Sequence, residues 1–383
     1  MRILTLVHEY PPVGGGGGRV AQDVARGLAA RGHEVRVLTA HHGDLPRREL
    51  DGGVEVLRLR SCRREAFRAD LKAMGCYVTA AVLAGLRVVR RWKPGVIHAH
   101  FAVPAGAAAW ALSRLTRTPY VLTAHLGDVP GGAPEKTGRW FRWIFPFTKP
   151  IWRGAAHITA VSEFTRRLAQ EHYPVEVRVI PNGVDVEALK PRDFRLHNPP
   201  HILFAGRFMP QKNPLQVVRV LSRLQSLPWR CTMMGDGPLL EQTKAAVSEN
   251  GLGDRFTFTG WITPQEVLAQ FDEGDILFMP SRSEGLPVVG VQALAKGLAV
   301  VAGKVGGFLD VVADGENGFL IPPEDADAAA EALRSLLTDS NRLLAFRKAS
   351  LRRARRFDLS EVVAAYEETL SQALPVGGEF SLP

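Results

Sequence analysis

The sequence has 383 residues, which is too long for one hydrophobic core of ordinary size, so we expect two domains of roughly 190 residues each. Hydrophobic residues make up 46% and charged residues 23%, as is typical of a soluble globular protein, and no run of about 18 uncharged apolar residues predicts a transmembrane helix. Cys62, Cys76 and Cys231 are few, odd in number and unpatterned, which fits a reducing compartment and gives no zinc or redox motif.

The formal net charge of +9 is concentrated in the first half of the chain. Residues 1–190 hold 28 Lys and Arg against 16 Asp and Glu, a net charge of +12, whereas residues 191–383 hold 20 against 23, a net charge of −3. This asymmetry suggests that the first half meets an anionic partner such as lipid headgroups, a phosphorylated acceptor or nucleic acid. The alternative is an arginine-rich surface without a dedicated partner. Because no recognition motif accompanies the charge, nucleic acid is not an expected partner.

The chain opens with a βαβ pattern around a glycine loop. Residues 2–7 predict a strand, residues 19–30 a helix, and residues 31–39 a helix end followed by a second strand. The glycines at 14–18 have neither the G-x-G-x-x-G dinucleotide spacing nor the Lys-Ser/Thr of a P-loop. Such glycines either let backbone N–H groups approach a ligand oxygen or anion, or form only a flexible tip.

Histidines mark the ends of the next predicted strands, which lie at residues 54–59, 95–98, 120–123 and 157–161, with a helix at 71–91 among the helical patterns between them. His98, His100 and His125 fall at strand ends, where an open α/β sheet presents residues to a ligand crevice. A pair of histidines two residues apart can bind a metal, but the sequence signals no third ligand nearby. We therefore expect no metal site.

Residues 139–153 concentrate aromatic and basic side chains in fifteen positions. Trp and Phe interleaved with Arg and Lys suit a segment that lies at a membrane interface. The alternative is a helix that packs its aromatic rings into the domain and leaves its basic ends in water. The pattern favours burial slightly, and peripheral membrane contact stays open.

The second half repeats the layout of the first after a proline-bounded linker at residues 191–200. Strands are predicted at residues 201–205, 230–234, 256–259, 276–279 and 299–302, with helices between them. This alternation predicts a second doubly wound parallel sheet. A terminal helix is predicted at residues 359–373.

Residues 275–297 predict a strand, a polar turn and a helix that Gly297 ends. The turn places Glu284 at the carboxyl end of a strand, and the following helix offers backbone N–H groups and a partial positive charge to a diphosphate. Gln292 lies eight residues later on that helix. A carboxylate, an amide and a helix end together fit a sugar-nucleotide site, whereas the alternative is an ordinary βα unit with a solvated glutamate.

A second cluster of charge follows the predicted strand at 201–205. Arg207 and Lys212 are five residues apart, and a guanidinium with an ammonium suits a diphosphate. Several further motifs occur in a fixed order with these residues: the glycine loop after Pro11-Pro12, Arg31-Gly-His-Glu-Val, Ile180-Pro-Asn-Gly-Val-Asp185, Met234-Gly-Asp-Gly-Pro238, Phe258-Thr-Gly-Trp261, the Glu284 stretch, Val305 to Pro322, and Phe357-Asp-Leu-Ser-Glu. From residue 1 to about residue 370, this order resembles family 4 glycosyltransferases of the GT-B fold.

The resemblance implies an α/β protein with two Rossmann-like, doubly wound domains that face a central cleft. Residues 1–190 would form the acceptor-binding domain, residues 191–358 the domain that binds the nucleotide sugar, and the terminal helix at about 359–375 would pack back on the first domain. The resemblance also implies retention of the anomeric configuration, and neither a cofactor nor a divalent metal.

The resemblance assigns the donor contacts by position. Arg207 and Lys212 would clamp the diphosphate and stabilise the departing charge. Glu284 would bond hydroxyls of the transferred sugar, and the backbone around Gly260 and Trp261 would hold the base. The predicted donor-binding residues are Gly15, Gly16, Gly17, Arg207, Lys212, Gly260, Trp261, Glu284, Gly285, Leu286 and Gln292, and the predicted catalytic residues are Glu284, His125, Arg207 and Lys212.

The loop of Gly15 to Gly17 would approach the sugar or phosphate, with His125 beside the reacting centre and no side chain as nucleophile. One position departs from the family pattern, which has a second glutamate where this chain has Gln292. An amide still bonds ribose hydroxyls through its oxygen and nitrogen, but it lacks the charge-assisted acceptance of a carboxylate. Donor affinity and nucleotide preference are therefore in question, whereas activity is not excluded.

The sequence thus predicts a metal-independent, retaining glycosyltransferase that moves a hexose-type unit from a nucleoside diphosphate sugar to a hydroxyl of a polysaccharide or lipid-linked acceptor. A cytoplasmic protein is expected, and contact with the inner face of the membrane stays open. The alternatives are a nucleotide-sugar 2-epimerase on the same fold and a non-catalytic protein that binds a nucleotide sugar, the latter motivated by Gln292.

Overall fold

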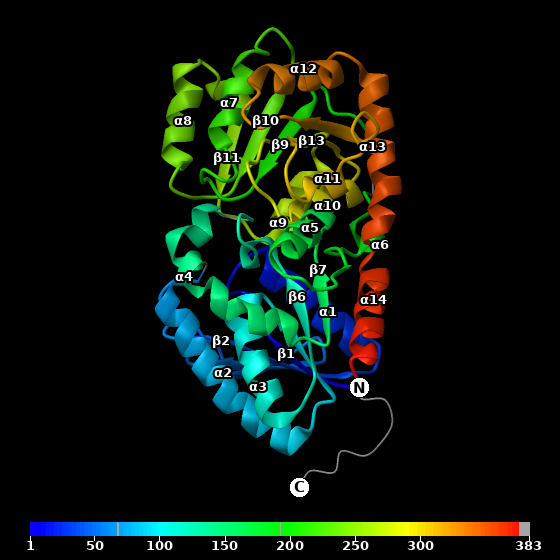
Figure 1. The fold of residues 1–383 in the computed structure, drawn as a ribbon. Coiled ribbons are helices and arrows are strands. Elements are labelled where there is room, and N and C mark those ends of the chain that lie inside the picture. The colour runs from blue at the N-terminus through cyan, green and yellow to red at the C-terminus, as the bar shows by residue number, and fades with distance from the viewer. Residues whose placement is uncertain (67–68, 133, 192, 375–383) are drawn as a thin grey trace. The chain divides into compact units, whose positions relative to one another are not determined.

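The computed structural model describes residues 1–66, 69–132, 134–191 and 193–374, without the side chains of residues 134–143. The chain forms two compact units (Figure 1). Unit 1 comprises Met1–Pro181 and the chain from Leu359 onward, and unit 2 comprises Asn182–Asp358. The boundary after Pro181 lies nine residues before the boundary after residue 190 that was expected from the sequence. The reason is that Asn182 and the short helix α6 (Val186–Leu189) pack within unit 2, against Leu286 and α10 (Val288–Ala295) respectively.

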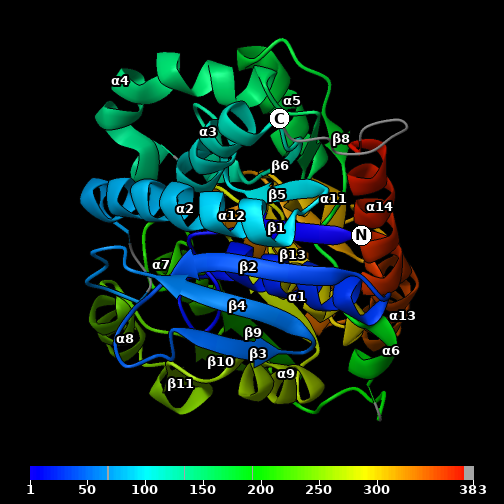
Figure 2. The ribbon, with the colours of Figure 1, turned by 90° about the horizontal axis from the view of Figure 1, so that it is seen from below.

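Unit 1 is built on an eight-stranded sheet with the strand order β3-β4-β2-β1-β5-β6-β7-β8, in which only the β3–β4 pair is antiparallel. Figure 2 shows β2, β4 and β3 side by side. The strands are β1 (Arg2–Leu6), β2 (Glu34–Ala40), β3 (Arg48–Asp51), β4 (Val54–Leu59), β5 (Val96–His100), β6 (Tyr120–Ala124), β7 (His157–Ala160) and β8 (Arg178–Val179). The central strands β1, β5 and β6 are apolar along most of their length because helices cover both faces.

The helices of unit 1 fall into two layers. Helix α1 packs with α14 on one face, whereas α2, α3 and α4 pack in series on the other, since the crossovers reverse direction after β4. The helices are α1 (Gly16–Ala30), α2 (Leu71–Trp92), α3 (Ala107–Thr116), α4 (Pro134–Arg153), α5 (Glu163–His172) and α14 (Leu359–Gln372), with short helical turns at Ala102–Gly106 and Leu126–Asp128. The terminal helix α14 therefore belongs to unit 1, where Arg31 on the α1 side donates to Glu367.

Unit 2 is built on a six-stranded, wholly parallel sheet with the order β11-β10-β9-β12-β13-β14. The strands are β9 (His201–Ala205), β10 (Arg230–Met234), β11 (Phe256–Gly260), β12 (Ile276–Met279), β13 (Ala299–Gly303) and β14 (Gly318–Ile321). The chain builds β9, β10 and β11 outward on one side, then returns to the other side of β9 with β12. The winding therefore reverses between β9 and β12, which makes this pair the topological switch point.

Helices cover both faces of this second sheet. Helices α7, α8 and α12 pack together on one face, and α10, α11 and α13 pack on the other (Figure 1). Besides α6 and α10, the helices are α7 (Pro214–Ser222), α8 (Leu240–Glu249), α9 (Pro264–Asp272), α11 (Phe308–Val311), α12 (Ala326–Leu337) and α13 (Ser340–Ala354), with short turns at Gly253–Arg255 and Arg355–Phe357.

The predicted strands appear within one or two residues of their expected bounds, and the helix expected to end at Gly297 is α10. Three strands, β3, β8 and β14, were not predicted, because each has only two to four residues and lies at a sheet edge. Helix α1 begins at Gly16, three residues earlier than expected, so Gly16 and Gly17 lie in its first turn rather than in a flexible loop.

Two of the three cysteines are paired, which the spacing in the sequence did not reveal. Cys62, just after β4, forms a disulfide with Cys76 on α2, fourteen residues later. The cysteine count favoured a reducing compartment, in which disulfides are rare, so this pair does not fit that expectation. Cys231 on β10 is free and buried, and burial raises the pKa of its thiol.

Among the described residues, one helix, α2, is by length and composition apolar enough to cross a membrane. Its inner face packs in the unit, where the Tyr77 hydroxyl donates to the carbonyl of Leu38 at 2.8 Å. In the aromatic segment at 139–153, the side chains of residues 139–143 lie outside the description. Among the others, Trp152 is fully buried and stacks on Tyr173, whereas Phe147 is exposed. The burial of aromatic rings that the sequence pattern favoured for this segment is therefore confirmed for Trp152.

Candidate functional site

The candidate donor residues of unit 2 lie at the carboxyl edge of its sheet. The loop after β9 contains Arg207 and Lys212, and the loop after the neighbouring strand β12 contains Glu284. Because parallel strands end at the same edge, the two loops meet at the switch point between β9 and β12. This is the position at which open α/β sheets bind ligands.

Lys212 and Glu284 form an ion pair across this switch point. The Lys212 Nζ lies 2.6 Å from Glu284 Oε1, and the side chains are 19% and 6% exposed. Arg207, five residues before the lysine, is exposed. A partly buried ammonium and carboxylate beside an exposed guanidinium can exchange their mutual contact for contacts with a ligand phosphate and a ligand hydroxyl.

The loop that contains Glu284, residues 281–287, has no regular secondary structure but is fixed by packing against other segments. Gly306 and Gly307, after β13, lie directly beneath its backbone, and the Gly307 amide donates to the Glu284 carbonyl at 3.2 Å. A Cβ on Gly306, where φ is +50°, would lie 1.7 Å from the Glu284 carbonyl oxygen. Glycine at 306 therefore permits the close approach that sets the height of this loop.

The other predicted donor residues lie around the same edge of unit 2. Gly285 and Leu286 follow Glu284 in the loop, and Gln292 is half-buried in the second turn of α10, which the loop leads into. Gly260 ends β11, and Trp261 follows it with 58% of its surface exposed, which is unusual for so large an aromatic ring.

In unit 1 the winding reverses between β1 and β5, and the glycine loop follows β1 at this second switch point. Glu9 organises the loop: its Oε2 accepts from the Gly15 amide at 3.2 Å, and its Oε1 accepts from Arg63 at 3.2 Å. The Arg63 side chain is 1% exposed. Burial alone would raise the pKa of Glu9, but His8, Arg63 and the Gly15 amide together hold that pKa below its ordinary value.

His125 follows β6 and lies against residues from β5 and its end. Its Nε2 is 3.5 Å from His100 Nδ1, and the Phe101 ring stacks on the imidazole with a centroid distance of 4.2 Å. A Cβ on Gly17 would meet the Phe101 ring at 2.4 Å. Phe101 therefore bridges the first turn of α1 and His125, and brings two predicted site regions together inside unit 1.

The histidines of this region are neutral at pH 7. Burial lowers the pKa of His125 to about 4 and of His98 to about 3, and it places that of His100 well below the ordinary value. Asp128 behaves in the opposite way: burial raises its pKa to about 7, although the backbone of His125, Ala102 and Val103 donates to the carboxylate. The histidines at the carboxyl edge of unit 1 are thus uncharged groups that can donate or accept hydrogen bonds.

The structure brings together Lys212 and Glu284 in unit 2, and Gly17 and His125 in unit 1 through Phe101. The sequence analysis missed four residues that shape these sites: Phe101, Asp128, Gln211 and Asn182. Three of them lie in motifs that were noticed for other reasons, next to His100, after His125 and in Ile-Pro-Asn-Gly-Val-Asp. Their roles depend on contacts between distant segments, which a motif does not show.

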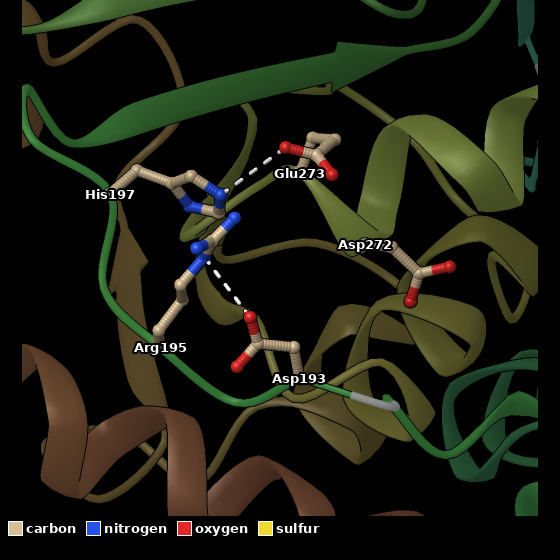
Figure 3. A pocket seen from close by; sticks show the side chains of 5 residues that line it. All are labelled: Asp193, Arg195, His197, Asp272 and Glu273. Atoms are coloured by element: carbon tan, nitrogen blue, oxygen red, sulfur yellow. Dashed lines mark ion pairs between the residues drawn. The ribbon is translucent and has the colours of Figure 1, made fainter.

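A polar pocket lies at the opposite, amino edge of the unit 2 sheet, lined by Asp193, Arg195, His197, Asp272 and Glu273 (Figure 3). His197 pairs there with Glu273 and with the fully buried Asp275, which also binds Arg347 at 2.5 Å. This network anchors the start of β12 and is separated from Glu284 by the length of that strand. Within the described residues, no group of three or more His, Cys, Asp or Glu could hold a metal ion.

Family models match both halves of the chain. Residues 14–188 match the model described as "Glycosyltransferase Family 4", and residues 185–353 match "Glycosyl transferases group 1". The 2-deoxystreptamine glucosyltransferase of Streptomyces kanamyceticus is 30% identical over 350 residues, which cover 84% of this chain and 89% of that protein. The D-inositol 3-phosphate glycosyltransferase of Stackebrandtia nassauensis is 30% identical over 402 residues, covering 95% and 89%.

Solved structures share the fold. The sucrose-phosphate synthase of Thermosynechococcus elongatus superposes with a TM-score of 0.85 at 22% identity, covering 97% of this chain and 98% of that one. The Anabaena protein HepE in complex with UDP-glucose superposes with a TM-score of 0.76 at 21% identity, covering 97% and 99%. These likenesses confirm the predicted GT-B class, with two parallel-sheet domains.

The close approach at Gly306 predicts an unequal response to alanine at two glycines. Gly306 and Gly315 both have positive φ, at +50° and +79°, but a Cβ meets the Glu284 backbone only at Gly306 and meets nothing within 4 Å at Gly315. Both variants carry the cost of a left-handed alanine. Gly306→Ala should lose a further 1–3 kcal/mol or so of unfolding free energy through overpacking, measured by urea denaturation. Equal losses in the two variants would show that the loop yields without cost.

The neutral histidines predict a loss of stability in acid. Unfolding exposes rings that take up protons below pH 6.5, so the stability they contribute is complete above pH 6.5 and is lost as pH falls toward 4. Each ring contributes a slope of up to about 1.4 kcal/mol per pH unit. Asp128 opposes this trend, because its raised pKa stabilises the fold as pH falls from 7 to 4.

His98→Gln should reduce the net acid slope by up to about 1.4 kcal/mol per pH unit, because one of these rings is removed. The measurement is the urea unfolding free energy at intervals between pH 6.5 and 4.5. A slope identical to that of the wild type would mean that the pKa of His98 is the same in the folded and unfolded chains.

Proposed function

Because this chain belongs to glycosyltransferase family 4, we propose that it moves a hexose-type sugar from a nucleoside diphosphate sugar to a hydroxyl of a polysaccharide or lipid-linked acceptor. The observation that carries the proposal is the contact between Lys212 and Glu284 at the switch point of unit 2, with Arg207 on the same loop as the lysine. This places two cations and one carboxylate at the position where an open sheet binds ligands.

Donor binding replaces the Lys212–Glu284 ion pair. The diphosphate takes the ammonium of Lys212 and the guanidinium of Arg207, both of which bind phosphate oxygens well. Glu284 then accepts hydrogen bonds from hydroxyls of the transferred sugar. The ligand-free pairing keeps the buried carboxylate compensated until the sugar arrives, which avoids the cost of an unpaired buried charge.

We propose that the reaction retains the anomeric configuration. The bond between the anomeric carbon and the diphosphate oxygen breaks, the acceptor oxygen bonds to the same carbon on the same face, and the hydroxyl proton passes to the leaving phosphate. Negative charge develops on the diphosphate, where Arg207 and Lys212 stabilise it and take the place of a divalent metal. The family resemblance assigns His125 to the reacting centre, where its neutral imidazole would introduce no second charge.

Uridine diphosphate sugars are the first donors that we propose to test, because the solved Anabaena neighbour is described in complex with UDP-glucose. The exposed Trp261, after β11, offers an aromatic surface beside the backbone proposed to hold the base. Gln292 on α10 offers an amide to the ribose hydroxyls.

The charge of the first half supports an anionic or membrane-associated acceptor. The relatives named above act on 2-deoxystreptamine and D-inositol 3-phosphate, so small cyclic polyols belong in the acceptor search beside glycans and lipids. The outer face of α2 supports the lipid-linked choice: Leu71 and Leu83 are exposed, the end of the helix carries Arg87, Arg90 and Arg91, and its sequence has no acidic residue. Such a face suits the anionic inner surface of a membrane.

The proposal predicts that nucleoside diphosphate is released from the donor and that an acceptor raises the rate of release. The measurement is turnover of uridine, guanosine and adenosine diphosphate sugars with and without lipid extract, glycan extract or small polyols. Saturable donor binding without release under every condition would favour the non-catalytic binding protein, and conversion of the sugar without an acceptor would favour the epimerase.

Arg207→Ala should weaken binding of the nucleoside diphosphate by about tenfold or more, because a charge-assisted contact with phosphate is lost. Arg230→Ala is the matched control, since Arg230 is equally exposed but begins β10 at the opposite edge of the sheet. Unchanged affinity of the Arg207→Ala variant would remove this residue from the site.

Gln292→Glu should strengthen binding of the nucleoside diphosphate several-fold, because a carboxylate accepts ribose hydroxyls with charge assistance. Gln270→Glu on α9 introduces the same charge on a helix that returns to the amino edge of the sheet, and should leave affinity unchanged. Isothermal titration of both variants checks this. Equal affinities for wild type and Gln292→Glu would place residue 292 outside the nucleotide site.

A further inference from the structure

The direction of the Glu284 carboxylate depends on a loop that has no hydrogen-bonding pattern of its own. Residues 281–287 lie between β12 and α10, and no strand or helix includes them. Gly306 and Gly307 support the loop from below. Packing against these glycines limits how closely the loop backbone approaches the segment after β13. It does not fix the residues before and after Glu284, which need hydrogen bonds of their own.

Gln211 anchors the side of the loop that precedes Glu284. Its side-chain Nε2 donates to the Ser283 carbonyl at 2.8 Å, and its backbone carbonyl accepts from the Arg282 amide at 2.8 Å. The residue is only 9% exposed. Gln211 immediately precedes Lys212 in the chain. The same two hydrogen bonds therefore hold the loop that contains Lys212 against the loop that contains Glu284.

Asn182 anchors the side that follows Glu284. Its Nδ2 donates to the Leu286 carbonyl at 2.7 Å, and the residue is 4% exposed. Asn182 is also the first residue of unit 2 after the chain leaves unit 1 at Pro181. A buried carbonyl that loses a donor costs free energy, so this bond holds Leu286 in place.

We propose that Gln211 and Asn182 are positioning residues that clamp the loop on both sides of Glu284 and thereby aim its carboxylate at the donor sugar. This inference rests on the proposed function, in which Glu284 binds sugar hydroxyls and Arg207 and Lys212 bind the diphosphate. Neither positioning residue needs to touch the substrate.

The clamp has a consequence that general stabilisation does not share. If the two amides aim Glu284, their loss weakens recognition of the sugar while the diphosphate contacts of Arg207 remain. Affinity for a nucleotide sugar therefore falls more than affinity for the free nucleotide. A residue that only stabilises unit 2 changes both affinities in the same proportion.

The experiment compares Gln211→Met and Asn182→Leu, which retain size and remove the amide, with two matched controls. Gln225→Met and Asn250→Leu remove exposed amides of unit 2 that also donate to backbone carbonyls, of Asn250 and Ala246 respectively. The dissociation constants of UDP and UDP-glucose are measured for each full-length variant. Hydrogen exchange of the Arg282 and Gly307 amides, which bond to the carbonyls of Gln211 and Glu284, is measured without ligand.

We expect each clamp variant to weaken UDP-glucose about tenfold relative to UDP, and to exchange the two amides about tenfold faster, with both controls unchanged. An unchanged ratio of the two dissociation constants overturns the positioning role, as does exchange at the wild-type rate. If wild-type protein binds neither UDP nor UDP-glucose, the proposed uridine donor fails, and the exchange of the ligand-free loop alone decides whether the clamp exists.

Discussion

The parallel direction of all six strands in unit 2 is the constraint on which its candidate site depends. Parallel strands end at one edge, so loops that are far apart in the sequence meet there. Lys212 and Glu284 are 72 residues apart and yet lie in contact, because β9 and β12 are neighbours at the point where the winding reverses. Glycines at 306 and 307 allow a third loop to pack beneath the second. The contact between the two opposite charges is therefore a result of this topology.

The same constraint acts in unit 1 with different chemistry. Its carboxyl edge gathers neutral histidines and an aromatic ring, whose burial keeps positive charge away from the region. Glu9, near the glycine loop, accepts hydrogen bonds from Arg63 and the Gly15 amide. The candidate site of unit 2 thus contains an ammonium and a carboxylate in contact, whereas the histidines gathered in unit 1 are neutral.

The polar groups at the amino edge of unit 2 pair with one another in a partly buried network. Asp275 is fully buried, and its oxygens are occupied by Arg347, His197 and the His201 amide. Removing Arg347 would take the guanidinium from the fully buried Asp275 carboxylate, so this ion pair holds the start of β12 and α13 together.

The sequence by itself determined the strands and the residue types of the candidate donor site. The largely apolar runs at residues 201–205 and 276–279 coincide with β9 and β12, because a strand covered on both faces must be apolar along most of its length. Motif order was sufficient to identify the family and to locate Arg207, Lys212 and Glu284 on loops. These features are local, so a pattern within a few residues contains them.

Only the tertiary structure decided which of these residues touch, and which others hold them. The Cys62–Cys76 disulfide, the start of α1 at Gly16 and the edge strands β3, β8 and β14 depend on packing partners outside their own segments. The amides of Gln211 and Asn182 are ordinary in sequence and acquire a role only when the fold places the carbonyls of Ser283 and Leu286 opposite them. Hydrogen bonds between distant segments produce no periodic pattern or fixed spacing in the sequence. The residues of the candidate site were therefore predictable, whereas the residues that hold its loops in place were not.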